Sequence, residues 1–203
     1  MTNNTPEMVD MVFDLEGGTI PAAYPFALWE ALTRCFPQLA EERSIGVLPL
    51  RGTGNIEGLL LPKRAKLVMR LPTALAGSAS TRLSGQQFDI AGSTIRLGAA
   101  KTRPIHPFPT IHAQLVMGAS DEVLFVEHIQ TQLGEMKIKG KLICGKRRSI
   151  SDDSQSVHGY SLVVHDLKPE ASLHLQFVGL GENRQFGCGI FVPSKVISGL
   201  GED

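Results

Sequence analysis

The sequence predicts an α+β protein in which helices cover one face of antiparallel sheets. Apolar residues alternate with polar ones in several short segments, which is typical of half-buried strands. In other segments they recur every three or four residues, which is typical of helices. The order of these segments in the first half of the chain is repeated in the second half. With 203 residues, 42% of them hydrophobic, the chain is long enough for two small domains.

The first half opens with an apolar segment at 8–15 that we expect to be a strand. A helix should follow over 21–36, because one stripe of residues recurs there at spacings of three and four: Phe26, Trp29, Leu32, Thr33 and Phe36. The other elements expected in this half are strands at 45–50 and 66–71, a helix at 73–84, and a hairpin of 87–90 and 93–97 around an Ala-Gly turn.

The proline-dense stretch 104–109 separates the two halves, because repeated proline forces an extended backbone and blocks helix formation. We therefore expect one domain at 1–104 and a second at 105–203. The elements expected in the second half are a strand at 110–117, a helix at 120–133, strands at 141–149 and 156–165, a helix at 169–178 and a strand at 184–192.

Each half thus has the order strand–helix–strand–strand–helix–strand. This is the order of ferredoxin-like (RRM-like) domains, so the sequence predicts two such domains in tandem. The fold supports many unrelated functions, and function must therefore be argued from candidate sites.

The net charge is zero, yet the charged residues are segregated along the chain. Residues 51–103 carry nine basic and two acidic side chains, and residues 137–148 carry six basic and no acidic ones. Residues 1–50 and the tail from 149 on carry seven acidic residues each. This pattern predicts a one-sided basic surface suited to a polyanion such as nucleic acid. The alternative is that the charges cancel across neighbouring strands.

Several classes of protein are disfavoured. The three cysteines are widely spaced and make neither a disulfide framework nor a zinc pattern, and the six histidines lack metal-ligand spacing. The apolar runs are too short to cross a membrane, and the polar first residues have no secretory pattern. We expect a cytoplasmic protein without membrane association, metal or cofactor.

The most distinctive local feature is a glycine-rich segment at 179–189, which has glycines near its two ends and one arginine between them. Glycine lets backbone N–H groups approach an anion, and arginine is a bidentate phosphate donor, so the segment is a candidate phosphate-binding loop. The alternative, equally supported by the spacing, is a tight turn followed by a bulged strand. The candidate residues are Gly179, Gly181, Arg184, Gly187 and Gly189.

Two clusters of basic residues are further candidates for binding RNA. Lys146, Arg147 and Arg148 are consecutive in an expected strand, so they cannot all be buried. A looser cluster contains Arg51, Lys63, Arg64 and Lys66. The competing interpretation of both is a solvated run of charge.

These residues resemble a known family. The ending Gly-Leu-Gly-x-x-Arg-x-x-Gly-Cys-Gly-Ile-Phe at 179–191 is similar to the glycine-rich loop of CRISPR-associated RAMP proteins. The phrases Met-Val-Phe-Asp-Leu-Glu-Gly-Gly at 11–18 and Leu-Ile-Cys-Gly-Lys-Arg-Arg at 142–148 resemble the repeat-processing endoribonuclease, the sixth Cas family. The similarity extends from about residue 9 to residue 195.

The resemblance implies an antiviral-defence protein that binds the repeat hairpin of precursor CRISPR RNA. Such a protein would cleave the RNA on the 3′ side of the stem without a metal, through attack of the 2′-hydroxyl on the adjacent phosphate. It would then remain bound to the guide RNA as a subunit of an effector complex. The basic triplet, the glycine loop with Arg184, and Lys63 and Arg64 would hold the RNA.

The sequence departs from the family pattern at one point. Many members have a catalytic histidine in or just after the first helix, and this chain has no histidine before His106. Leu48 occupies the expected region and cannot transfer a proton. Either the residue is lost, or Tyr24, Arg51, His106 or His112 replaces it, or cleavage proceeds mainly by positioning.

We therefore expect Tyr24 and Arg51 in the catalytic region of an RNA-processing endoribonuclease. Two alternatives remain open. One is a catalytically impaired RAMP subunit that only holds the guide-RNA hairpin, and the other is a ferredoxin-like binding module without a role in RNA metabolism.

Overall fold

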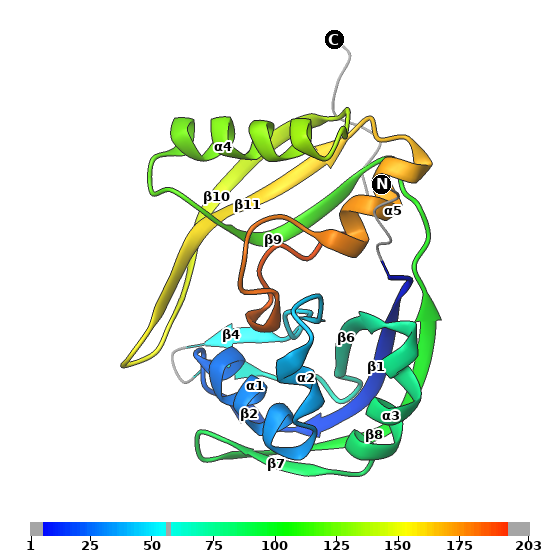
Figure 1. Ribbon diagram of the computed structural model, residues 1–203. Helices are drawn as coiled ribbons and strands as arrows, with labels where there is room; N and C mark the ends of the chain where they lie inside the picture. The colour runs from blue at the N-terminus through cyan, green and yellow to red at the C-terminus, as the bar shows by residue number, and fades with distance from the viewer. Residues whose placement is uncertain (1–5, 56–57, 195–203) are drawn as a thin grey trace.

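The computed structural model describes residues 6–55 and 58–194 and shows an α+β protein with antiparallel sheets (Figure 1). The ends of both expected domains, 1–5 and 195–203, lie outside the described residues. The first elements are β1 (Met8–Gly17), β2 (Thr19–Ile20), α1 (Tyr24–Cys35), α2 (Gln38–Glu41), β3 (Gly46–Val47), β4 (Thr53–Asn55), β5 (Gly58–Leu60), β6 (Lys66–Pro72), α3 (Thr73–Leu83), β7 (Gln87–Ile90) and β8 (Ser93–Pro104). The later elements are β9 (Ile111–Met117), α4 (Glu122–Glu135), β10 (Lys141–Ser151), β11 (Ser156–His165), α5 (Pro169–Val178), the 3₁₀ helix η1 (Arg184–Phe186) and β12 (Val192–Pro193).

The first sheet has the strand order β3-β6-β1-β8-β7 among the described residues, and its neighbours pair antiparallel. The expected hairpin of β7 and β8 is confirmed, with Ala91 and Gly92 both in left-handed conformations at its turn. Helices α1 and α3 pack against this sheet around Phe13 and Leu67. Strands β2, β5 and β4 form a separate small sheet.

Helix α1 buries the predicted stripe in part. Leu32 and Phe36 enter the core of the first sheet as expected, Trp29 packs half-buried against it, and Leu28 joins them. Phe26 is buried instead in a separate cluster against the second half. A helix that contacts two surfaces buries more than one stripe, so the spacing of its apolar residues identified only part of the core face.

The second sheet has the strand order β10-β11-β9-β12 among the described residues. Phe125 and Ile129 of α4 pack against Val116 and Leu162 of this sheet, and Figure 1 shows α4 lying along its outer face. Helix α4 begins after Asp121, whose carboxylate accepts a hydrogen bond from the backbone N–H of Leu124 at 3.0 Å.

The strand expected at 184–192 is wrong for most of its length. Residues Arg184–Phe186 form a 3₁₀ helix, and only Val192 and Pro193 pair with β9. Asn183, Gly187 and Gly189 have φ values of 63°, 92° and 63°. Left-handed residues at these intervals turn the chain repeatedly and prevent a continuous ladder of hydrogen bonds.

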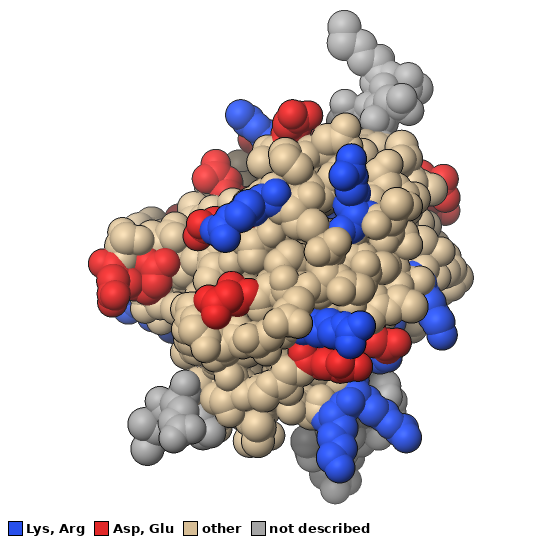
Figure 2. Space-filling view, turned by 90° about the horizontal axis from the view of Figure 1, so that it is seen from below, with Lys and Arg blue, Asp and Glu red and all other residues tan. Residues whose placement is uncertain are grey.

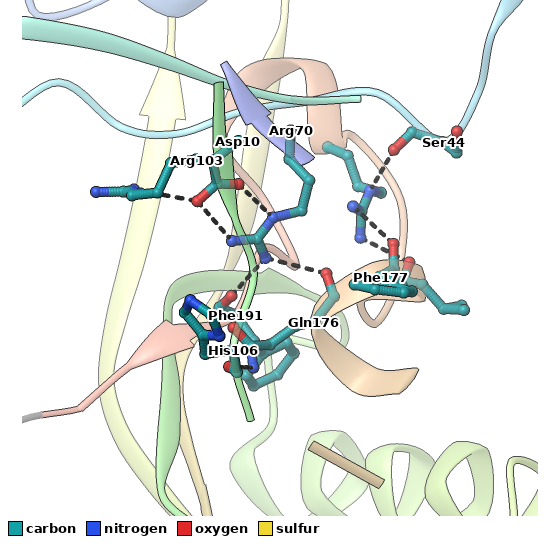
Figure 3. A network of polar contacts seen from close by, with 10 residues as sticks. Asp10, Ser44, Arg70, Arg103, His106, Gln176, Phe177 and Phe191 are labelled. Atoms are coloured by element: carbon teal, nitrogen blue, oxygen red, sulfur yellow. Dashed lines mark hydrogen bonds and ion pairs between the residues drawn. The ribbon is translucent and has the colours of Figure 1, made fainter. Parts of the chain in front are cut away.

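The boundary between the two halves, which we call the seam, is held by apolar and polar contacts. Its apolar part is the buried cluster of Phe26, Leu115, Val157 and Cys188. Its polar part centres on Arg70, which is 1% exposed and pairs with Asp10 at 2.8 Å (Figure 3). Arg70 Nη1 also donates to the carbonyls of Gln176 at 3.0 Å and Phe191 at 2.6 Å, so one guanidinium joins the first sheet to the second half.

No helix within residues 6–55 and 58–194 is long and apolar enough to cross a membrane.

Candidate nucleic-acid interface

The glycine-rich segment lies in the seam, where Figure 1 shows it descending from α5 toward the first half. A Cβ atom on Gly189 would collide with the carbonyl of Leu180, and one on Gly179 would collide with the Arg184 side chain. A Cβ atom on Gly187 would lie 3.0 Å from the Pro49 ring. These three glycines are buried and allow close packing of backbone, which favours the tight-turn interpretation for them; Gly181 is exposed.

Arg184 is not available to RNA in this structure. Its side chain is 6% exposed, and its nitrogens donate to the carbonyls of Ser44 at 3.2 Å, Val178 at 2.6 Å and Phe177 at 3.1 Å. Burial, and next the nearby charge of Arg70, lower the pKa of Arg184 to about 10, so it stays charged at neutral pH. The expected phosphate donor is instead a bridge between α5 and the Ser44 loop of the first half.

Tyr24 holds the segment that follows β3. Its hydroxyl oxygen accepts a hydrogen bond from the backbone N–H of Leu50 at 2.7 Å, and the neighbouring Pro49 packs on Gly187. Burial raises the pKa of Tyr24 to about 12, so the phenol remains protonated at neutral pH. Tyr24 therefore positions the segment 48–51 and is unsuited to serve as a general base.

Arg51 ends this segment as an exposed residue. The pairing of Thr53 with Leu60 brings the residues before β4 next to those after β5, so Arg51, Lys63 and Arg64 lie at the same end of this hairpin. Lys63 and Arg64 are both exposed, as Arg51 is.

His112 lies on β9 in the second half, and its side chain is half-buried. Its neighbours Ile111 and Ala113 are 0% and 1% exposed in the core of the second half, so the alternation of β9 directs His112 to the opposite face of the sheet. An irregularity in the pairing with β11, between Ala113 and Val116, shifts the alternation, so Leu115, which packs in the seam, lies on that same face. Burial, and next the charge of Arg51, lower the pKa of His112, and a contact with the Val192 backbone opposes them.

The basic triplet lies on β10, an edge strand of the second sheet. Lys146, Arg147 and Arg148 are all exposed. Arg147 pairs with Tyr160, which enters the core beneath α4, whereas Arg148 pairs with Gly159, next to the seam residue Val157. Because directly paired residues project to the same side of a sheet, Arg147 and Arg148 point to opposite faces.

Charge segregation along the sequence is partly neutralised in space. Asp10 of β1 pairs with Arg70 of β6 and with Arg103 of β8, and Asp14 pairs with Lys66. On the face drawn in Figure 2, basic and acidic side chains are interspersed. Several basic side chains thus bind to groups of the protein itself, as Arg184 does with backbone carbonyls. Lys66, which we expected in the cluster with Arg51, pairs with Asp14.

Sequence reasoning did not detect the Asp10–Arg70 pair. Asp10 falls among the apolar residues of the β1 pattern, and Arg70 falls among those of β6. The pair could have been predicted from the two charged residues that interrupt apolar strand patterns, because buried charges are almost always paired.

Comparison with known proteins agrees with this architecture. The family model described as Cas6 Crispr matches residues 9–196. A protein named CRISPR-associated endonuclease Cas6 from Myxococcus xanthus is 33% identical over 192 residues, which cover 94% of this chain and 83% of that protein.

The fold is also similar to solved structures. A CRISPR-associated protein Cas6 superposes with a TM-score of 0.66 and 12% identity, over 93% of this chain and 100% of that one. The Cse3 protein of Thermus thermophilus, solved with an RNA representing a pre-cleavage complex, has a TM-score of 0.55 and 14% identity, over 92% and 98% of the two chains. At these identities the likeness concerns the fold alone. The match of the family model to nearly the whole chain, together with the Myxococcus relative, shows that this chain belongs to the Cas6 family.

Proposed function

We propose that this chain binds the repeat hairpin of precursor CRISPR RNA and cleaves it on the 3′ side of the stem without a metal. Membership of the Cas6 family and the endonuclease name of the Myxococcus relative support this proposal. The observation that carries it is the segment 48–51, which is held by Tyr24, packs on Gly187 and ends in the exposed Arg51.

The proposed reaction needs few groups. The 2′-hydroxyl attacks the adjacent phosphorus and the bond to the 5′ oxygen breaks, which leaves a cyclic phosphate and a 5′-hydroxyl. A cation that faces the phosphate stabilises the charge developing on its oxygens, and we assign this role to Arg51. Tyr24 keeps Arg51 in place through Leu50, so we assign it a positioning role.

The RNA stem would lie along basic residues of both halves. Arg148 projects toward the seam side of the second sheet, and Lys63 and Arg64 adjoin Arg51. Arg147 projects to the other face, so it and Arg148 would contact different phosphates of a folded RNA. Gly181, exposed at the start of the glycine segment, would allow close approach of the RNA backbone.

The fold supports a matching assignment of domains. We propose ferredoxin-like domains at 1–104 and 105–203, because each sheet contains the strand order expected for that fold. We further propose that the protein acts in the cytoplasm and stays on its product as a subunit of an effector complex.

A second candidate function is a hairpin-binding subunit with little cleavage. Leu48 is the observation that favours it, because no proton acceptor stands where many relatives have a histidine. A binding module without a role in RNA metabolism is favoured only by the ion pairs that neutralise Asp10 and Asp14.

Incubation with a labelled repeat RNA, scored for retention and for cut products, distinguishes these functions. The proposal predicts tight, salt-sensitive binding and slow cutting that a chelator leaves unchanged. Binding without any cut product would favour the hairpin-binding subunit, and absence of both would favour the module without RNA.

The triple substitution Lys146→Ala, Arg147→Ala and Arg148→Ala tests the proposed role of the basic triplet in RNA binding. We expect affinity to fall at least about tenfold, and the slope of log affinity against log salt to fall by about one for each phosphate that the variant no longer neutralises. The matched control replaces three exposed arginines of the first half, Arg34, Arg82 and Arg96, with alanine. Equal decreases in affinity for both triple variants would contradict the assignment.

A further inference from the structure

We propose that a cavity between α2 and the glycine-rich segment binds one unpaired guanine base of the RNA. This inference rests on the proposed function for the source of the base, and it gives the protein a means of choosing among RNA sequences. It is supported by the depth of the cavity, by an indole in its wall and by the charged groups that surround it.

The cavity has a volume of about 520 Å³ and lies where the glycine-rich segment meets the helices α1 and α2 of the first half (Figure 1). Its innermost residues are buried, since Leu39, Ile45 and Arg184 are 0%, 2% and 6% exposed. Its rim includes the exposed residues Arg43 and Glu182. A buried floor below an exposed rim can hold a ligand that enters from solvent, and the volume is within the range of small-molecule sites.

The cavity adjoins the segment that we assign to the reaction. Residues of 42–45 and of 181–185 line the cavity, and the same two stretches of chain meet again farther along, where Pro49 packs on Gly187. Arg51 follows two residues after Pro49. A base held in the cavity would therefore belong to a nucleotide near the phosphate that we assign to Arg51, so this is a position at which sequence beside the cut can be recognised.

Trp29 gives the cavity an aromatic wall. Its side chain is half-buried, because it packs on the core of the first sheet and also lines the cavity. Unpaired RNA bases stack on aromatic side chains, and the indole offers a large flat surface for this contact. Stacking is tolerant of sequence, so the identity of the base must be distinguished by polar groups.

The charged residues that line the cavity are two of each sign, Glu42 and Glu182 with Arg43 and Arg184. A ligand that carries both donors and acceptors suits such a lining better than a simple anion or cation does, and a nucleobase is a ligand of this kind. Arg184 already donates to three backbone carbonyls. Arg43 makes no ion pair within residues 6–55 and 58–194, so it is the arginine left to contact a base.

Glu42 is held in a fixed orientation at the cavity. Its Oε1 atom accepts hydrogen bonds from the backbone N–H and the hydroxyl of Ser44 at 3.0 and 2.7 Å, which leaves its Oε2 atom for a ligand. A carboxylate can accept two hydrogen bonds from neighbouring donors, and guanine is the RNA base whose Watson–Crick edge presents two N–H donors side by side. Arginine is the usual partner of the guanine O6 and N7 atoms, a role that we assign to Arg43.

The first test measures the fluorescence of Trp29, the single tryptophan of the chain, during titration with nucleoside monophosphates. A stacked base quenches an indole, so we expect saturable quenching by guanosine monophosphate. Adenosine, cytidine and uridine monophosphates should bind at least about tenfold more weakly. Inosine monophosphate lacks the 2-amino donor and should show a similar loss of affinity.

Two variants test the assigned contacts. Glu42→Gln keeps the size of the side chain but replaces one acceptor by a donor, and Arg43→Ala removes the donor that we assign to O6 and N7. Each should weaken binding of guanosine monophosphate at least about tenfold. The matched controls are Glu41→Gln and Arg34→Ala, at exposed positions that do not line the cavity, and both should bind like the wild type.

The second test determines whether the base belongs to RNA. The affinity of the wild type is measured for a labelled repeat RNA and for versions in which one unpaired guanine at a time is replaced by inosine. One of these replacements should weaken binding at least about tenfold. The same replacement should have little further effect on Glu42→Gln, because the acceptor of the 2-amino group is already lost.

The outcomes separate the site from the proposed function. Equal quenching by all four standard nucleotides, or none by guanosine monophosphate, overturns the guanine site and leaves the proposed RNA cleavage standing. Selective binding of guanosine monophosphate, combined with an RNA affinity that no inosine replacement changes, overturns the assignment to RNA and identifies a free nucleotide as the ligand. A protein that binds no repeat RNA overturns the proposed function and the RNA source of the base, while the nucleotide titration decides the site by itself.

Discussion

Buried arginines show how position within the fold changes the meaning of a residue. Arg70 and Arg184 are counted among the basic residues of the sequence, yet both are nearly inaccessible and donate to backbone carbonyls across the seam. Arg51 and Arg148 carry the same side chain at exposed positions. Hydrogen bonds from a buried charge contribute to stability only while every partner is in place, so the two groups of arginines should respond differently to substitution.

Replacement of Asp10 by asparagine tests this difference. The substitution leaves the buried guanidinium of Arg70 without its anionic partner, and we expect the free energy of unfolding to fall by about 3 kcal/mol. Urea unfolding followed by circular dichroism measures it. The control is Asp14→Asn, which removes an exposed pair with Lys66 and should have little effect, because solvent already screens that interaction. Similar decreases in both variants would refute the argument.

At the scale of elements, the glycine segment behaves as a folded connection between α5 and β12. Its helix-ending residue was predicted correctly: α5 spans Pro169–Val178, and Gly179 follows with a φ of 75°. The segment then turns at further left-handed residues and packs on the Pro49 segment of the first half. The glycines thus contribute to the site indirectly, since they fix the segment that directs Arg51.

A pair of glycine substitutions distinguishes conformational strain from steric contact. Gly92→Ala places a side chain in open space at a φ of 86°, and should lower the free energy of unfolding by about 1 kcal/mol. Gly189→Ala, at a φ of 63°, also drives a methyl group into the Leu180 carbonyl, and should lower it by about 3 kcal/mol or more. Thermal unfolding of both variants provides the comparison. A Gly189→Ala protein as stable as Gly92→Ala would show that the segment relaxes freely.

At the scale of the whole molecule, the seam couples the two halves. The apolar cluster around Phe26 and the carbonyl contacts that Arg70 and Arg184 make across the seam join residues from distant parts of the chain. The seam residues also hold the segment 48–51, which ends in the exposed Arg51. We therefore expect that any cleavage site built across the halves depends on the seam being intact.

Unfolding in urea tests this coupling. Trp29, the single tryptophan, reports on the first half by fluorescence, and far-ultraviolet circular dichroism reports on the whole chain. The two curves should coincide in the wild type. In Arg184→Leu, which leaves three carbonyls without a donor, the curves should separate and the first transition should move to lower urea. The control is Arg82→Leu at an exposed position of α3; separate curves in the wild type would contradict the coupling.

The local pattern of apolar and polar residues was sufficient to predict most of the helices and strands. The strands at 66–71, 141–149 and 156–165 and the helices at 73–84 and 169–178 agree with the structure to within a few residues, because each has a continuous pattern of its own and a proline or glycine at or near a boundary. The strand expected at 184–192 failed, since alternating apolar residues cannot reveal that left-handed turns interrupt them.

The sequence by itself determined the order of strands and helices, membership of the Cas6 family and the presence of a leucine, not a histidine, at position 48. Only the tertiary structure decided which charges are free to meet a ligand, because ion pairs such as Asp10–Arg70 join strands 60 residues apart. It also decided that Arg184 is enclosed and that Arg51 is exposed. Burial and proximity arise when distant segments pack, and a pattern confined to neighbours along the chain carries no information about either.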